Sequence, residues 1–519
     1  MIHWLTAVLL GETLILAMRR VGQVRAGWAL ACAAVWAVHP LNSMPVVYIS
    51  QRMESLMAAF YVVALWALLK ANVQGELTRT NKIWSHSMML CLCAAVLAIL
   101  SKEVGVTLLV AVPLVDWWCG TTQGQPWLFV KRNRKVYLIM GFVFGAVMLW
   151  HSRGPRADEL ITGEPLAVPW EYFKVQCGSV FNYLKLIFWP HPLIFQHAPV
   201  PAMGLSQWLP QGLALAALLG LILHLGRFYK WVVVPGLLFF IVLAPTSSFV
   251  PIPADPQLEH RMYLPSFFVI ILAMALGTGL VRLLKIGRWG SMAIVGVIGA
   301  VLSLATVRRV ADYESPATLW NDVVSKQPWN GKAWINLGIA LLDSDPQAAG
   351  QCAQHVIAMA EDNPTALSWG RMLEGMAIFH QGDYQAGGNT ALSGSAPGEP
   401  QPEGDYSLAL AAFEEAGKLN SAGELTGLST YIGHTLIRLN RIDEGIGLLR
   451  QELARESFGT YAAKAALAEG LYKQGNTVEA LQLLAQLKQE APQLRIVAEV
   501  ERRMASAPSQ PSDRAGLPK

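Results

Sequence analysis

Several charged and polar residues lie where apolar runs of this chain end, and packing alone does not require them there. The stretch His39–Glu54 (HPLNSMPVVYISQRME) separates two apolar segments. A short turn between two later apolar runs carries a neighbouring lysine and glutamate, and a further group precedes the run that begins near 262. The residues of these places that could do chemistry are His39, Arg52, Glu54, Lys102, Glu103, Glu259, Arg261 and Tyr263.

Fixed cations beside a membrane suit one chemistry, because they match the anionic oxygens of a lipid-linked phosphate or pyrophosphate. Arg52, Lys102 and Arg261 are the candidates to bind such a phosphate. A carboxylate beside them suits a general base for an incoming hydroxyl, and Glu54 and Glu103 are the candidates. His39, Glu259 and Tyr263 would support them. The structural alternative is that each charge only snorkels to the membrane surface, or that Lys102 and Glu103 neutralise each other.

The composition places these residues in a membrane protein. The 519 residues are 53% hydrophobic and 15% charged, whereas soluble domains carry about 25% charged residues. Residues 1–306 are a series of apolar runs, and the remainder is ordinary soluble helical sequence, so we expect two domains. The basic residues form no soluble stripe, which argues against nucleic acid as a partner. The six cysteines show neither a disulfide framework nor metal-ligand spacing, so no metal site is expected.

A spanning helix needs about 20 mostly apolar residues, and ten segments come near that length. These candidate spans are 4–18, 26–38, 53–69, 84–100, 104–118, 136–150, 209–225, 231–245, 262–281 and 291–306. If they alternate, five basic clusters fall on one side, which the positive-inside rule makes cytoplasmic. The clusters are Arg19, Arg20 and Arg25; Lys70, Arg79 and Lys82; Lys131, Arg132, Arg134 and Lys135; Arg227 and Lys230; and Arg282, Lys285 and Arg288. The loops 39–52, 101–103, 151–208 and 246–261 then lie on the opposite side. The amphipathic run 172–189 is predicted to lie on the outer interface, with a true span as the alternative.

The soluble part, 307–505, has the pattern of tetratricopeptide (TPR) repeats. Trp334, Leu337, Gly338 and Leu341 match the first helix of such a repeat, and about four repeats are expected in a short α-solenoid. Residues 394–405 (GSAPGEPQPEGD) are predicted to be a flexible loop, and 506–519 a disordered tail. Such solenoids bind extended peptides or partner proteins, and the alternative here is a spacer. The expected fold class is therefore all-α, a polytopic helical bundle followed by a TPR solenoid.

Four segments, in order over roughly residues 1 to 345, resemble a known family. They are HPLNSMPVVYISQRMESL, LSKEVGVTLLVAVPLVDWW, EHRMYLPSFF and ESPATLWNDVVSKQPWNGKAWINLG. They look like the TPR-bearing GT-C membrane proteins, a group that includes transmembrane-and-TPR O-mannosyltransferases and bacterial relatives. The resemblance implies a GT-C bundle with extracytoplasmic catalysis, a polyprenyl-phosphate sugar donor, an inverting mechanism and a lumenal or periplasmic TPR domain.

The site residues carry over by position. Arg52 and Glu54 match the Arg-x-acidic pair of the family, Lys102 and Glu103 match its Ser-Lys-Glu, and Arg261 with Tyr263 matches its Arg-x-Tyr-Leu-Pro. The family also implies an acidic motif in a first outward loop, which would precede this chain because its first span matches the family's second. We expect that the true start lies upstream. The alternative is a chain that is inactive as written, and Met44, where the family tends to carry Glu, points the same way.

Three functions follow as hypotheses. The first is a membrane glycosyltransferase that moves a sugar from a polyprenyl-phosphate donor to an extracytoplasmic acceptor, here the Ser/Thr hydroxyls of a protein, in a bacterial inner membrane with the TPR domain in the periplasm. The second is a catalytically inactive membrane-anchored TPR scaffold for envelope or secreted proteins. The third is a polymerase or ligase of surface polysaccharide, which shares the donor. The expected partners are the bilayer, the lipid-linked sugar and a protein or peptide bound by the TPR domain.

Overall fold

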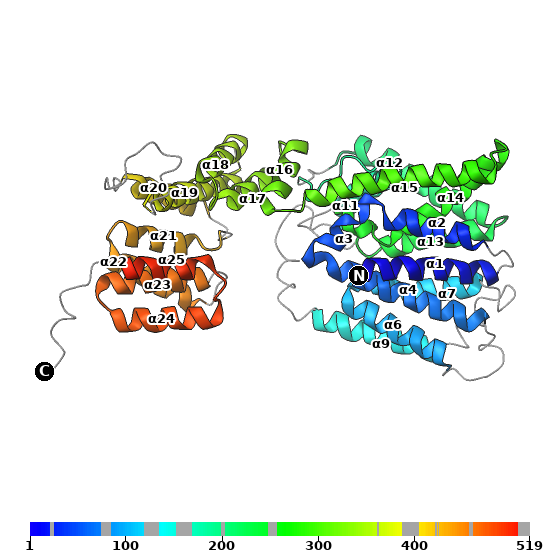
Figure 1. Cartoon of the computed structure of the whole chain (residues 1–519), viewed down its shortest axis with the longest axis horizontal. Coiled ribbons are helices and arrows are strands. Elements are labelled where there is room, and N and C mark those ends of the chain that lie inside the picture. Colours follow the sequence, from blue (N-terminus) through cyan, green and yellow to red (C-terminus); the bar gives the residue numbers. More distant parts are fainter. Residues whose placement is uncertain are drawn as a thin grey trace. The chain divides into compact units, whose positions relative to one another are not determined.

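The computed structural model is all-α, as the sequence predicts, and it divides into two compact units, Met1–Lys326 and Gln327–Lys519 (Figure 1). The division falls later than the expected boundary at 306, because contacts tie the segment after it to the first unit. Arg309 donates to Asp322 at 2.9 Å, and Lys326 donates to the Leu193 carbonyl at 2.8 Å. The structure describes residues 1–20, 25–73, 85–118, 134–151, 169–198, 203–247, 257–360, 363–386, 404–420, 423, 425–455 and 460–506.

Each of the ten predicted spans forms a helix in unit 1, and so does the predicted interfacial run. The long helices are α1 (Ile2–Arg20), α2 (Ala26–Ala37), α4 (Arg52–Val73), α6 (His86–Ser101), α7 (Leu108–Trp118), α9 (Arg134–His151), α11 (Pro169–Phe188), α12 (Leu205–Gly226), α13 (Lys230–Leu243), α14 (Pro265–Leu283) and α15 (Arg288–Ala311). Shorter elements join them, namely η1 (Pro40–Asn42), α3 (Ser43–Val47), η2 (Ile49–Gln51), η3 (Glu103–Thr107) and η5 (Glu259–Met262), and α16 (Pro316–Lys326) closes the unit.

Five of these helices are long and apolar enough to cross a membrane: Ile2–Arg20, Ile49–Val73, Leu205–Gly226, Pro265–Leu283 and Arg288–Ala311. The bent pair Ala26–Ala37 and Pro40–Val47 makes a sixth if it is counted as one span. His86–Ser101, Tyr137–Val147 and Trp231–Leu243 are shorter apolar helices. The chain is therefore compatible with membrane integration, while the number of ten spans and the side on which each loop lies stay predictions.

The turn between α6 and α7 explains why α7 starts later than its predicted span. Residues Glu103–Thr107 form the 3-10 helix η3, so the α-helix begins only at Leu108. Gly105 makes this tight turn possible, because a Cβ there would lie 2.5 Å from the backbone carbon of Ala98. Only glycine allows so close an approach of two backbone segments. The turn thereby fixes Lys102 and Glu103 at the end of the helix bundle.

Glu54 and Lys102 lie at one end of the helix bundle of unit 1, which we call the site end. Several contacts there join helices that are far apart in the chain. The ring of His3, in the first turn of α1, contacts the Ala37 carbonyl and the Tyr263 hydroxyl, each at 2.8 Å. Trp36 donates its indole N–H to the Tyr263 carbonyl at 2.8 Å, and Thr306 donates to the Val38 carbonyl at 2.7 Å. Helices α1, α2, α14 and α15 are thus joined at this end.

Unit 2 is a series of helices that pack as neighbouring pairs, and the described residues form four such pairs, while the number of repeats stays a prediction. They are α17 (Gly331–Leu341) with α18 (Pro346–Ala360), α19 (Pro364–Ala386) with α20 (Gly404–Leu419), α21 (Leu428–Arg438) with α22 (Ile442–Ala454), and α23 (Thr460–Gln474) with α24 (Thr477–Glu490), followed by α25 (Arg495–Ser506). The predicted loop falls almost wholly within 387–403, and the predicted tail within 507–519, both outside the described residues.

Small residues let the two helices of a repeat approach closely. A Cβ on Gly445 would lie 2.7 Å from the Gly433 carbonyl oxygen and 2.8 Å from the Ile437 side chain. Two residues further along the same helix, Gly447 has nothing within 4 Å of its Cβ position. Two glycines of one helix therefore differ in role, since one lies at a backbone contact and the other faces open space.

This difference gives a matched stability test. We expect Gly445→Ala to destabilise residues 327–519 by about 1–3 kcal/mol, because the added methyl group meets a backbone oxygen that cannot move aside. Gly447→Ala should instead stabilise by about 0.5–1 kcal/mol, since alanine is the better helix former. Urea unfolding of residues 327–519 measures both changes, and equal effects of the two substitutions would contradict the close crossing.

Candidate functional site

A buried ion pair joins two of the predicted site residues. Glu54 lies in the first turn of α4, and Lys102 is the C-terminal cap of α6. The Lys102 ammonium donates to the Glu54 carboxylate, and the two side chains are only 9% and 3% exposed. Breaking such a pair from one side leaves an uncompensated buried charge, which costs about 3–5 kcal/mol. Glu54 and Lys102, 48 positions apart in the chain, thus form one unit of the site.

His260 lies beside this pair, although its role was not among the sequence predictions. Its side chain is 4% exposed, and its Nδ1 atom is buried without a hydrogen-bond partner. Burial holds the pKa of His260 well below its usual range, and the positive charges of Lys102 and Arg261 lower this pKa further. The imidazole is therefore neutral at pH 7 and has one polar atom free to meet a ligand. The sequence feature that could have identified His260 as a site residue is its position directly before the predicted site residue Arg261.

Arg261 is held by α11 and the end of α13. Its Nη1 atom donates to the Tyr172 hydroxyl at 3.2 Å and to the Thr246 carbonyl at 3.0 Å, and Tyr172 itself donates to that carbonyl at 2.8 Å. The guanidinium is 4% exposed. The predicted interfacial helix thus contributes a side chain to the site. Tyr172 was missed because a tyrosine in an amphipathic run does not reveal which loop it will face.

The charges of this group decide what it could bind. Lys102 and Arg261 are cations, the Glu54 carboxylate is paired with Lys102, and His260 is neutral. The four residues, which we call the site-end cluster, therefore carry an excess of positive charge in buried surroundings. An anionic group such as a phosphate would complement that excess through charge-assisted hydrogen bonds.

Three predicted supporting residues make structural contacts. Glu259 accepts a hydrogen bond from the Ile194 N–H and lies 3.6 Å from Arg309, and burial raises its pKa to about 7 although the Arg309 charge lowers it. The Nε2 atom of His39 donates to the Ile187 carbonyl at 2.9 Å, while its Nδ1 atom accepts from the Leu41 N–H at 3.2 Å. Tyr263 contacts His3 as described above. These residues shape the site end and position its turns.

The remaining predicted residues lie next to the cluster in the chain. Arg52 begins α4 and is exposed, whereas Glu103 begins η3 and is half-buried. Both are within two residues of a member of the Glu54–Lys102 pair. Parts of the predicted outward loops, 152–168, 199–202 and 248–256, lie outside the described residues. Within the described ranges, no group of three or more His, Cys, Asp or Glu residues is arranged for a metal ion.

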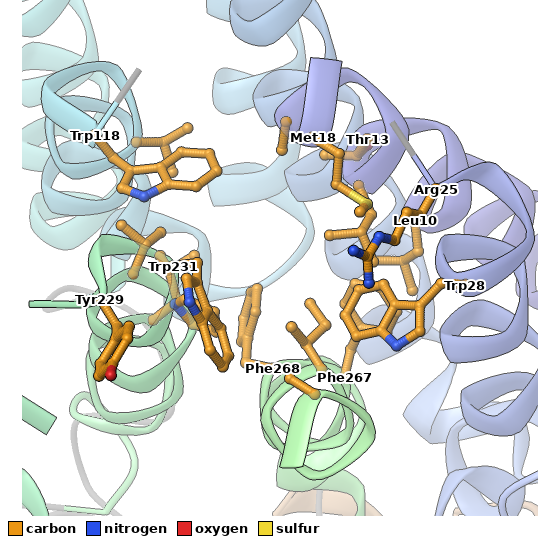
Figure 2. A pocket seen from close by; sticks show the side chains of 18 of the residues that line it. Leu10, Thr13, Met18, Arg25, Trp28, Trp118, Tyr229, Trp231, Phe267 and Phe268 are labelled. Carbon is orange, nitrogen blue, oxygen red and sulfur yellow. The ribbon is translucent and has the colours of Figure 1, made fainter. Parts of the chain in front are cut away.

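A second feature of unit 1 is a cavity of about 830 Å³ among α1, α2, α4, α7, α13 and α14 (Figure 2). Most of its wall is apolar or aromatic, and Arg25, Arg227 and Arg282 also line it. These arginines belong to three of the basic clusters that the sequence predicts to lie on one side of the membrane. Their convergence on one cavity brings those three clusters to the same end of the bundle, which we call the basic end.

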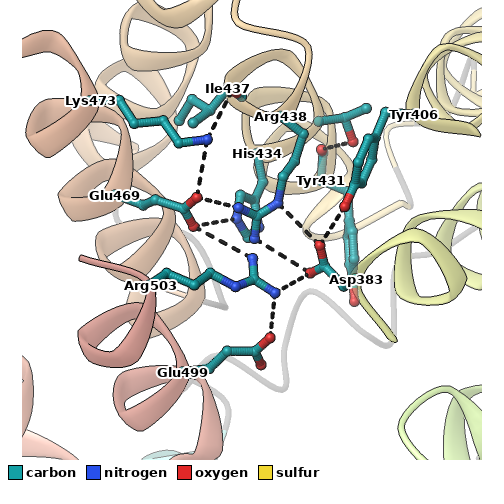
Figure 3. Close-up of polar contacts among 11 residues, drawn as sticks. Asp383, Tyr406, Tyr431, His434, Ile437, Arg438, Glu469, Lys473, Glu499 and Arg503 are labelled. Atoms are coloured by element: carbon teal, nitrogen blue, oxygen red, sulfur yellow. Dashed lines mark hydrogen bonds and ion pairs between the residues drawn. The ribbon is translucent and has the colours of Figure 1, made fainter. Parts of the chain in front are cut away.

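Unit 2 contains a buried polar network that joins its repeats (Figure 3). Glu469 of α23 accepts from Arg438 of α21 and lies 3.3 Å from His434, while Arg438 and Arg503 contact Asp383 of α19 at 3.2 and 2.9 Å. Burial would raise the pKa of Glu469, but the hydrogen bond with His434 and the Arg438 charge outweigh it and bring this pKa to about 2. The network connects helices of different repeats and is structural in character.

No protein-family model matches the chain, and no curated protein matches it. Among solved structures, a thermophilic TPR protein of Thermus thermophilus is similar, with 21% sequence identity and a TM-score of 0.29 over 40% of this chain and 93% of that chain.

Arg309 contacts three carboxylates near the site end, and its replacement tests how much these contacts stabilise unit 1. Asp312 and Asp322 accept from it at 3.1 and 2.9 Å, and Glu259 lies within ion-pair distance. We expect Arg309→Met to destabilise unit 1 by about 3–5 kcal/mol, because it removes the cation that lies beside the buried Glu259 carboxylate. Arg308→Met, at an exposed neighbour, is the control. Thermal unfolding in detergent measures both variants, and equal melting temperatures would contradict a stabilising role for the Arg309 contacts.

The second test uses the pKa of His260. Between its usual pKa, about 6.5, and its lower folded pKa, the unfolded chain binds a proton that the folded protein does not. The contribution of His260 to the stability of unit 1 should therefore fall as the pH drops below about 6.5, and His260→Gln should remove that contribution. Melting temperatures between about pH 7.5 and 5.5 measure it. His224→Gln, at an exposed histidine, should keep the wild-type slope; an unchanged slope in His260→Gln would refute the explanation.

Proposed function

We propose that this chain is a GT-C-type membrane glycosyltransferase that moves a sugar from a polyprenyl-phosphate donor to an extracytoplasmic acceptor, the hydroxyl of a protein Ser or Thr. The observation that carries the proposal is the buried site-end cluster. It combines two cations, Lys102 and Arg261, with a carboxylate and a neutral histidine at the end of a bundle of apolar helices. Donor phosphate and acceptor hydroxyl need those group types.

In this proposal Lys102 exchanges its partner when the donor binds. In the free protein the Glu54 carboxylate holds the Lys102 ammonium in place. A donor phosphate would take over Lys102 and reach Arg261, and the His260 Nδ1 atom, which has no partner, would face the bound group. The excess positive charge then offsets the negative charge that develops on the leaving phosphate.

The released Glu54 carboxylate would act as the base. The acceptor hydroxyl oxygen attacks the anomeric carbon while the bond from that carbon to the phosphate oxygen breaks, and the phosphate leaves with the electron pair. The hydroxyl proton passes to Glu54. Attack from the face opposite the leaving phosphate inverts the anomeric centre. Glu103, half-buried beside Lys102, is the second candidate base, and Arg52 is the exposed candidate for contact with the outer part of the donor.

The two units divide the work in this proposal. Unit 1 would lie in a bacterial inner membrane with the site end toward the periplasm, where lipid-linked sugars rather than nucleotide sugars serve as donors. Unit 2 would bind the acceptor protein or peptide, since stacked helix pairs form extended binding surfaces. The same arrangement without transfer would be a membrane-anchored scaffold, which is the second candidate. What favours the scaffold is that Glu54 and Lys102 already satisfy each other.

Sugar transfer in proteoliposomes tests the proposal, with the chain alone and with any in-frame upstream extension. We expect transfer from a polyprenyl-phosphate sugar to a Ser/Thr peptide, and a loss of at least about 100-fold in Lys102→Met, since removal of one preorganised donor costs about 10²–10³ in rate. The variant leaves Glu54 without its partner, so its folding is checked by circular dichroism.

Lys174→Met is the matched control, because Lys174 is also ion-paired, at 2.6 Å with Glu171, but lies outside the site-end cluster. It should keep transfer near the wild-type rate. Folded wild-type protein that transfers no sugar in either form would rule out the enzyme. If that protein still binds extended peptides through residues 327–519, the scaffold is the better description.

A further inference from the structure

The cavity at the basic end has the size and wall of a lipid site. Its volume of about 830 Å³ falls within the range of about 300–1,000 Å³ that is typical of ligand pockets. Leu10, Leu65, Leu238, Phe267 and Phe268 supply apolar wall from four different helices. Figure 2 shows the labelled aromatic and aliphatic side chains arranged around an open centre. Such a wall suits a hydrocarbon chain and does not suit a small polar metabolite.

The polar groups of this cavity carry one sign of charge. Arg25 precedes α2, Arg227 follows α12, and Arg282 lies in the last turn of α14, so three separate elements each bring one arginine. Among the described residues that line the cavity there is no aspartate or glutamate. All three arginines are exposed, and Arg25 points toward the open centre in Figure 2. Cations at the mouth and hydrocarbon within match an anionic amphiphile.

Aromatic residues mark the level at which the head group would lie. Trp28, Trp118, Tyr229 and Trp231 line the cavity, and Trp28, Tyr229 and Trp231 lie within four residues of Arg25 or Arg227 in the chain. Trp28 donates its indole N–H to Thr278 at 3.0 Å, which fixes the ring on α14. Tryptophan and tyrosine gather at the boundary between hydrocarbon and water in membrane proteins. The mouth therefore has the composition of the head-group region, and the interior has that of the acyl region.

We propose that this cavity binds an anionic phospholipid of the bilayer leaflet on the basic side, with its phosphate among Arg25, Arg227 and Arg282 and one acyl chain against the apolar wall. A zwitterionic lipid also has a phosphate, but its ammonium group would be repelled by the three arginines. The apolar wall reaches Leu264 near the start of α14, but the proposed phosphate position is separate from the site-end cluster, because Arg282 lies roughly 26 Å along that helix from Pro265. It does not depend on the proposed sugar transfer.

Lipid binding to the purified full chain tests the proposal. Native mass spectrometry after exchange into detergent with equal phosphatidylglycerol and phosphatidylcholine should show a roughly tenfold preference for phosphatidylglycerol. The triple variant Arg25→Gln, Arg227→Gln and Arg282→Gln should lose that preference. Ala275→Trp, which fills the cavity and leaves its charges in place, should reduce the binding of both lipids.

The matched control removes three charges from the same end without touching the cavity. Arg19, Lys285 and Arg288 are exposed and belong to neighbouring basic clusters, but they do not line the cavity. Their joint replacement by glutamine should keep the preference. Equal retention of the two lipids by the wild type would overturn the proposal, as would an equal loss in both triple variants, which would show a general surface attraction. Circular dichroism confirms folding, and unaltered lipid binding in Ala275→Trp would place the lipid elsewhere.

Discussion

A charge buried inside a helix bundle needs a partner, and this constraint organises the first unit. Desolvation of an ion costs several kcal/mol, so a buried lysine or arginine must meet a carboxylate or a set of carbonyl groups. Lys102 meets Glu54, Arg261 meets the Thr246 carbonyl and the Tyr172 hydroxyl, and Arg309 meets two aspartates and Glu259. The pairs Lys102–Glu54 and Arg309–Glu259 fix the turns at the site end, because they join segments far apart in the chain.

The same constraint separates residues that serve the structure from residues that could serve a ligand. Glu259, His39 and Tyr263 have their partners within the protein and make the contacts that position η1 and η5. His260 differs, since its Nδ1 atom is buried without a partner while two cations lie near it. A buried polar atom without a partner needs an explanation, and a bound ligand would supply one. The site-end cluster is therefore the place where the proposed phosphate chemistry fits.

The two ends of the bundle carry different positive sites. At the site end the cations are buried and held by protein groups, which suits a ligand that must be oriented for reaction. At the basic end the arginines are exposed around an apolar cavity, which suits a lipid held by its charge and its hydrocarbon chain. In unit 2 the charged residues around Glu469 form ion pairs with one another, and these ion pairs join helices of different repeats.

The sequence by itself determined the helical segments, because apolar length and TPR spacing are local properties. All ten apolar segments and the run near 172–189 are helices, and four helix pairs follow. The sequence also placed Glu54 and Lys102 at the ends of neighbouring apolar runs, but it did not predict that the two side chains form an ion pair. The tertiary structure alone decided that His260 and Tyr172 join them, that Glu259 faces Arg309, and that three distant arginines share one cavity. Such contacts depend on how each helix packs against its neighbours and on its rotation about its own axis. The residue spacing within one segment does not determine either.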